Sequence, residues 1–118
     1  MRSVQKRAEK ISIRGEHKHH KLGAVVAIGN SILSVGWNKD KTHPKSPHAW
    51  KHVHAEMDAI IKAGKNCEGA DLYVARIGRD GTLRNAKPCP ACMSLILASG
   101  LHKVHFTDNG GWSTITIE

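Results

Sequence analysis

Four residues in two short motifs have the types and spacing needed to hold a metal ion and to move protons beside it. His54 and Glu56 lie two residues apart, and Cys89 and Cys92 form a Cys-x-x-Cys pair further along the chain. One imidazole and two thiols give three zinc ligands and leave a fourth position open, as in catalytic rather than structural sites. The pattern therefore predicts a catalytic zinc site, with Glu56 placed to handle protons rather than to bind the metal.

The spacing also indicates where these side chains must lie. Residues two apart in the middle of a helix point to nearly opposite sides, so His54 and Glu56 can serve one site only in a first helical turn. Cys89 and Cys92 share a face at a helix start, with Pro90 in the favoured first-turn position. We therefore expect two helix N-termini to meet at one metal, where their positive ends favour thiolate.

Such a site can perform a hydrolytic deamination. Zinc can lower the pKa of bound water to around 7. Glu56 can take up a proton from that water and deliver it to a ring nitrogen and a leaving amine. A closed zinc knuckle with Cys67 or another histidine as fourth ligand, in a non-enzymatic interaction module, is the structural alternative. Cys67 lies in a polar turn away from both motifs, and a knuckle has no use for Glu56.

The apolar pattern along the chain predicts the order helix, hairpin, helix, strand, helix, hairpin. Only a few residues join the last two strands, so these should run antiparallel. We expect one α/β domain over residues 1–118: three layers, with a five-stranded mixed sheet and helices on both faces. The expected helices cover 3–11, 53–63 and 90–99, and the expected strands cover 22–28, 32–37, 70–77, 102–107 and 112–117.

The composition of the chain indicates the cellular location of the protein. No apolar run approaches the roughly 20 residues that cross a bilayer, and the first residues lack the apolar segment of a secretory signal. Two of the three cysteines form one Cys-x-x-Cys pair, which disfavours a disulfide framework. The sequence therefore predicts a cytoplasmic protein with no membrane partner. The helix at 90–99 is apolar almost all round, which predicts burial in the core or in a homo-oligomer interface.

Positive charge is the main hint about partners. The net charge of +8 attracts anions such as nucleotides and nucleic acid, although solubility alone explains it equally well. Residues 17–21 form a dense histidine-lysine patch, interpreted as a solvated or anion-facing loop rather than a metal site. Lys39 and Lys41 begin a polar stretch that could bind a 5′-phosphate, and a solvated loop is the alternative there.

With these residues in hand, the chain resembles the cytidine deaminase superfamily over nearly its whole length. The resemblance implies that the histidine and the two cysteines of the motifs bind Zn²⁺ and that Glu56 is the proton shuttle. It also implies that Asn38 contacts the substrate's sugar or base. The backbone of Ala55 and the carbonyl of Pro88 would hold the carbonyl and amino groups of a pyrimidine.

Two features resemble different branches of that superfamily. The His-Cys-Cys ligand set is similar to that of deoxycytidylate, tRNA-adenosine and polynucleotide deaminases. The closing hairpin resembles the free-nucleoside branch. The leading hypothesis is deamination of cytidine, deoxycytidine or dCMP to the uracil form, with release of ammonia. The alternative is deamination of cytosine or adenine in single-stranded DNA or RNA; the charge favours it, but the aromatic content of 4% offers few stacking platforms.

Overall fold

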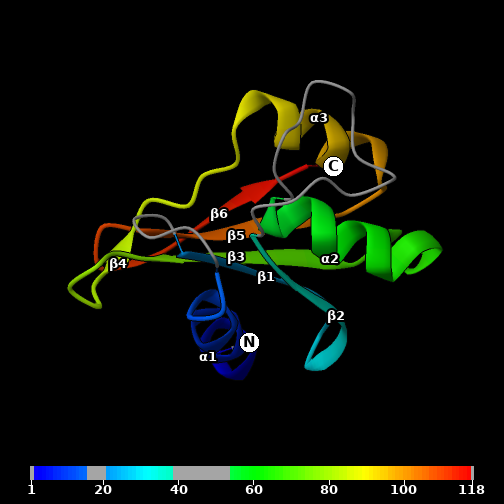
Figure 1. The fold of residues 1–118 in the computed structure, drawn as a ribbon. Helices are drawn as coiled ribbons and strands as arrows, with labels where there is room; N and C mark the ends of the chain where they lie inside the picture. Colours follow the sequence, from blue (N-terminus) through cyan, green and yellow to red (C-terminus); the bar gives the residue numbers. More distant parts are fainter. Residues whose placement is uncertain (1, 16–20, 39–53, 118) are drawn as a thin grey trace.

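A computed structural model describes residues 2–15, 21–38 and 54–117 (Figure 1). The elements are α1 (Arg2–Ser12), β1 (Lys21–Ile28), β2 (Ser31–Trp37), α2 (Ala55–Ala63), the 3₁₀ helix η1 (Gly64–Cys67), β3 (Asp71–Ile77), β4 (Leu83–Arg84), α3 (Pro90–Ala98), β5 (Lys103–Asp108) and β6 (Gly111–Thr116). Lys39, Lys41 and residues 17–20 of the histidine-lysine patch lie outside the described residues, so the phosphate and anion roles expected of them stay predictions.

The strands form one mixed sheet in the order β2-β1-β3-β5-β6. The pair β3–β5 is parallel, and the pairs β1–β2, β1–β3 and β5–β6 are antiparallel. In Figure 1, α1 lies below the sheet while α2 and α3 lie above it. The expected three-layer α/β arrangement is confirmed, and so is the antiparallel closing hairpin.

The prediction of five strands is wrong by one, because β4 adds a sixth strand along β3. Its two residues pair with the end of β3, Arg76 with Arg84 and Ile77 with Leu83. The hydroxyl of Thr107 donates to the carbonyl of Arg84 at 2.7 Å, which ties β4 to β5 as well. A two-residue strand has no room for an alternating pattern, so only its tertiary partners identify it.

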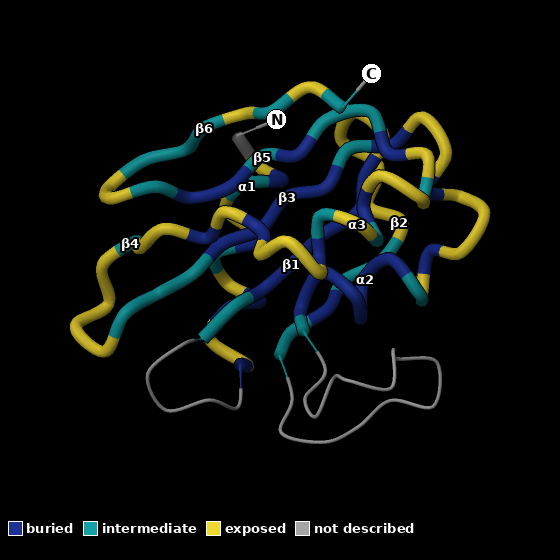
Figure 2. Tube along the Cα trace, turned by 90° about the horizontal axis from the view of Figure 1, so that it is seen from above, coloured by how far each residue is buried: buried dark blue, intermediate teal, exposed yellow. Residues whose placement is uncertain are grey.

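The core has two halves, one on each face of the sheet. Successive side chains of a strand point to opposite faces. On β1, Ala24 and Val26 therefore join the cluster beneath α2 and α3, while Val25 and Ala27 join the cluster against α1. Figure 2 shows β1 and β3 largely buried and β6 more exposed along its length. The central strands thus form a rigid platform on which both helix layers rest.

Two glycines set how closely those helices approach. A Cβ atom on Gly23 would lie 2.3 Å from the backbone nitrogen of Ser12 in α1, and one on Gly36 would lie 2.6 Å from that of Ala59 in α2. Any side chain at Gly36 would push α2 away from β2. Because α2 begins beside His54 and Glu56, this contact also fixes the position of the metal motif.

α3 is only partly enclosed by its own chain. Cys92 and Ile96 are buried, whereas the Leu97 side chain is 60% exposed. Burial of the whole helix in this chain's core, one half of the prediction, is therefore wrong. Association through α3 into a homo-oligomer stays a prediction. Among the described residues, no helix is both long and apolar enough to cross a membrane.

Candidate active site

The first motif lies at the N-terminus of α2. His54 is the residue before the helix and has an extended backbone (φ −79°, ψ 148°), and Ala55 begins the helical turns. This change of backbone conformation removes the conflict that a mid-helix spacing of two would create. Glu56 lies in the first turn and is 4% exposed. The structure therefore places both residues at a helix start, as the spacing requires.

The second motif begins α3 in the same way. Cys89 precedes the helix with an extended backbone (φ −69°, ψ 166°), and Pro90 follows as the first helical residue. Proline suits that position because its fixed φ matches the helix and the missing N–H has no intrahelical partner. Cys92 then falls on the inner side of the first turn, where it is 1% exposed. Cys89 is exposed.

The two helix starts bring three candidate ligands together. One ligand atom each from His54, Cys89 and Cys92 lies within 4.8 Å of the other two. Nδ1 of His54 is 3.1 Å from Sγ of Cys92. Imidazole and thiolate are the donors that zinc prefers, and atoms at this separation can share one tetrahedral ion. The residues present therefore fit a zinc ion held by three side chains.

Burial dominates the electrostatics of this group. It raises the pKa of the Glu56 carboxyl, and hydrogen bonds with its own backbone N–H and with the Cys92 side chain oppose part of that rise. Burial also raises the pKa of the Cys92 thiol, and the nearby charges of Glu56 and Cys89 raise it further. Two buried acidic groups, Glu56 and Cys92, lie beside the exposed thiol of Cys89, and a divalent cation would stabilise this arrangement.

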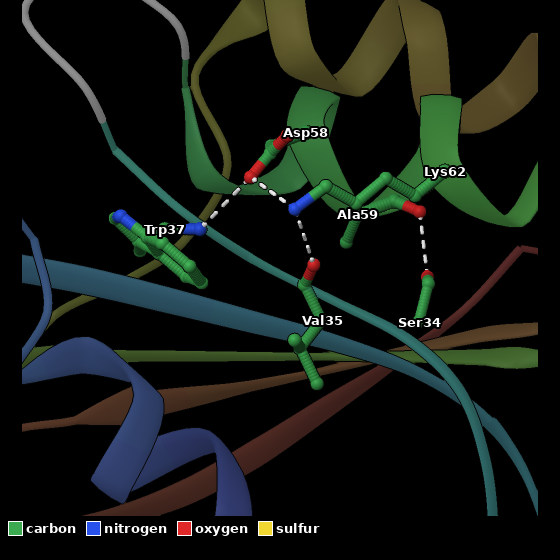
Figure 3. Close-up of polar contacts among 6 residues, drawn as sticks. All are labelled: Ser34, Val35, Trp37, Asp58, Ala59 and Lys62. Atoms are coloured by element: carbon green, nitrogen blue, oxygen red, sulfur yellow. Dashed lines mark hydrogen bonds and ion pairs between the residues drawn. The ribbon is translucent and has the colours of Figure 1, made fainter.

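Polar contacts hold α2 against β2 (Figure 3). The Ser34 hydroxyl donates to the carbonyl of Ala59 at 2.6 Å. The backbone N–H of Trp37 donates to the Asp58 carboxylate at 3.3 Å, and the Lys62 ammonium reaches that carboxylate at 3.2 Å. The Asp58 side chain is 4% exposed, so these bonds form in a partly desolvated setting. They fix the helix that begins at the first motif.

Asp58 is a supporting residue of the site that was not predicted from the sequence. A usable signal was present: Asp58 and Lys62 are four residues apart on a helix, the spacing of a surface ion pair. That spacing predicts an exposed pair of little consequence. The buried contact with Trp37 depends on β2 packing against α2, which is a tertiary feature.

Asn38 lies just after β2, at the end of the sheet. Its side-chain carbonyl accepts a hydrogen bond from the Leu22 N–H at 3.0 Å, and its own N–H donates to the Leu22 carbonyl at 3.3 Å. The residue therefore joins the end of β2 to the start of β1. A contact between Asn38 and a substrate's sugar or base stays a prediction, as do the pyrimidine contacts of Ala55 and Pro88, both of which are buried.

Cys67 lies apart from the group of three ligands. It ends η1, is 0% exposed, and its thiol donates to the Ile60 carbonyl at 3.7 Å. Burial raises the pKa of this thiol. The polar residues around it are exposed as expected, but Cys67 itself packs into the core, where it serves as a small apolar side chain.

The sequence profile described as "Cytidine and deoxycytidylate deaminase zinc-binding region" matches residues 1–108. The chain belongs to this family, and the fold and the grouped ligands agree with it. The match covers both metal-binding motifs of the chain.

Two curated relatives match most of this chain. An uncharacterized deaminase in the luxG 3′ region of Aliivibrio fischeri is 32% identical over 71% of this chain and 56% of its own length. The tRNA-specific adenosine deaminase of Bacillus subtilis is 32% identical over 90% of this chain and 58% of its own. The chain thus spans little more than half the length of these curated relatives.

A solved structure gives the same fold. The dCMP deaminase of cyanophage S-TIM5 superposes with a TM-score of 0.66, is 29% identical, and matches 89% of this chain and 79% of its own. The same phage enzyme has also been solved in complex with dCMP and dUMP.

Proposed function

We propose that this protein hydrolytically deaminates the cytosine of a mononucleotide, with dCMP as the leading substrate, to the uracil form. One observation carries the proposal: His54, Cys89 and Cys92 converge from two helix starts beside the buried carboxyl of Glu56. Three protein ligands leave a coordination position for a reactant, and a proton-transfer group lies next to it.

In this mechanism, zinc supplies a nucleophile from water at neutral pH. Glu56 accepts the proton that water gives up as its oxygen bonds to the ring carbon bearing the amino group. The carboxyl passes that proton to the ring nitrogen. It then takes up the remaining proton of the added hydroxyl and delivers it to the amine, so that the carbon–oxygen double bond forms, the carbon–nitrogen bond breaks and ammonia leaves. Because burial raises its pKa, Glu56 is a better proton acceptor than an exposed glutamate and can act at a pH nearer neutrality.

The proposed choice of a nucleotide rests on two supports. The cyanophage relative is a dCMP deaminase solved with dCMP and dUMP. Lys39 and Lys41, together with the net charge of +8, could attract a 5′-phosphate. We propose that these lysines bind that phosphate and that Asn38, Ala55 and Pro88 contact the sugar and base.

The substrate class can be tested by measuring ammonia release from cytidine, deoxycytidine, dCMP and a cytosine-containing oligonucleotide. We expect dCMP to give the highest kcat/KM. Charge reversal of Lys39 and Lys41 should raise KM for dCMP far more than KM for deoxycytidine, because only dCMP carries the phosphate. Equal effects on the two substrates would contradict the phosphate role, and the same kcat/KM for both would contradict the nucleotide preference.

The Bacillus subtilis relative favours a second candidate, deamination of adenine in RNA. It acts on tRNA adenosine, as its name states, and is 32% identical over most of this chain. An adenosine-containing RNA hairpin in the same ammonia assay separates the two candidates. Turnover of that RNA with none of dCMP would replace the leading proposal.

A further inference from the structure

The outer face of α1 carries a row of exposed polar and cationic side chains. Ser3, Lys6, Arg7 and Lys10 are all exposed. Their spacing of three and four residues places them along one side of the helix. Arg14, exposed just beyond the end of α1, continues the row by one further turn's spacing. We call these five residues the α1 row.

The first four members of the α1 row line a surface hollow of about 330 Å³, together with Val4 and two residues of the β1–β2 hairpin, Asn30 and Ile32. None of the lining residues is acidic. Glu9, the one carboxylate of α1, is half-buried and accepts a hydrogen bond from the Trp112 indole N–H at 3.0 Å.

The three cations of the hollow have no ion-pair partner within the described ranges 2–15, 21–38 and 54–117. Their charges therefore add to one another within the hollow, since none of the residues that line it is acidic. A concave surface with clustered positive charge concentrates anions and speeds their encounter with the protein. The Ser3 hydroxyl supplies a further hydrogen-bond donor beside these charges.

The α1 row runs from the β1–β2 turn toward the end of the sheet at Trp37. It begins beside the hairpin turn at Asn30 and ends at Arg14, whose guanidinium lies 5.4 Å from the centre of the Trp37 ring. Trp37 immediately precedes Asn38, at the end of the sheet. At about 1.5 Å rise per residue, the row is about 16 Å long. A nucleic-acid strand lying along that distance would pass more than one phosphate.

We propose that the α1 row is a docking surface for the phosphate backbone of a nucleic-acid strand. A flat anionic bilayer fits the concave hollow less well than a narrow strand does. Phosphate contacts carry no sequence information, and no described aromatic side chain is exposed on α1 to stack a base, so binding should be independent of sequence. The surface lies on the sheet face opposite α2 and α3 (Figure 1). It is therefore separate from the metal group.

Fluorescence anisotropy of a labelled single-stranded oligonucleotide of mixed sequence tests this surface. The variant Lys6→Glu/Lys10→Glu removes two cations of the hollow. The control Lys65→Glu/Arg79→Glu makes the same charge change at exposed positions outside the α1 row. Near 0.1 M salt we expect the α1 variant to weaken binding by about tenfold or more. Its salt dependence should also fall by about one to two units of slope, because two phosphate contacts are lost.

The control should keep the wild-type salt slope and bind within about threefold of wild type. An equal loss in both variants would show that net charge alone attracts the oligonucleotide, and would overturn the proposal. The proposal would also fail if the wild-type protein bound phosphatidylserine vesicles and not the oligonucleotide, or if it bound neither. Melting temperatures of both variants verify that the fold is kept. Binding is read without turnover, so the result does not depend on which base the protein deaminates.

Discussion

Glu56→Gln should lower kcat for deamination by about 10²–10⁴-fold while the protein keeps its zinc. Glutamine preserves the size and hydrogen-bonding reach of the side chain but cannot take up or release the proton that the reaction moves. The wild-type protein and the variant differ in one titratable group at the centre of the site. Activity is read as ammonia release, and bound zinc is read by elemental analysis of the same samples.

The stability of the metal-free protein gives the same substitution a second readout. Burial raises the pKa of Glu56, so the folded protein binds this proton more tightly than the unfolded chain does. Its contribution to stability is therefore greatest at low pH and is lost as pH rises toward the raised pKa. Glu56→Gln removes that dependence, and at neutral pH the metal-free variant should melt no lower than wild type.

The control is Glu68→Gln, at an exposed position after η1, which should change neither activity nor melting temperature. A Glu56→Gln variant with near wild-type kcat would contradict the proton-shuttle role. Loss of activity together with loss of zinc would show instead that the carboxyl supports metal binding.

Cys92→Ala is the change with the next largest expected effect, on zinc affinity. Cys92 supplies a thiol from the buried side of the site, 3.1 Å from the His54 imidazole. Loss of residues that only support metal ligands costs 10–100-fold in affinity, so removal of a ligand should cost more than about 100-fold. Competition with a chromophoric chelator measures that affinity, and deamination should disappear with the metal.

Cys67→Ala is the matched control, since Cys67 is equally buried but lies outside the ligand group. It removes one buried sulfur, so it should reduce stability by about 1 kcal/mol and leave zinc affinity unchanged. If the two alanine variants lost zinc to the same degree, Cys67 would be a ligand and the site would be closed.

The position of the metal site was predictable from the sequence because its spacing allows few solutions. A histidine and a glutamate two apart, and a Cys-Pro-x-Cys pair, converge only when each begins a helix. The structure has that arrangement at Ala55 and Pro90. The hairpins were predictable for a similar local reason, since short turn sequences separate apolar runs.

Features that depend on tertiary packing were not predictable in this way. β4 exists because two residues reach the free end of β3, and its sequence carries no strand pattern. Asp58 meets the Trp37 N–H only because β2 packs beside α2. Cys67 lies among polar neighbours in the sequence, and only the turn of η1 directs its side chain inward. For β4 and Asp58 a long-range contact determines the structure, and local periodicity carries no information about that contact.

Zinc-edge X-ray absorption of the zinc-loaded protein tests the central claim, a zinc ion with an open position beside Glu56. We expect two sulfur ligands near 2.3 Å and two nitrogen or oxygen ligands near 2.0–2.1 Å. One of the lighter ligands is His54, and the other comes from solvent and changes when dUMP is added. A spectrum with three sulfur ligands would indicate a closed structural site and contradict the account, whereas a spectrum unaffected by dUMP would contradict the nucleotide substrate.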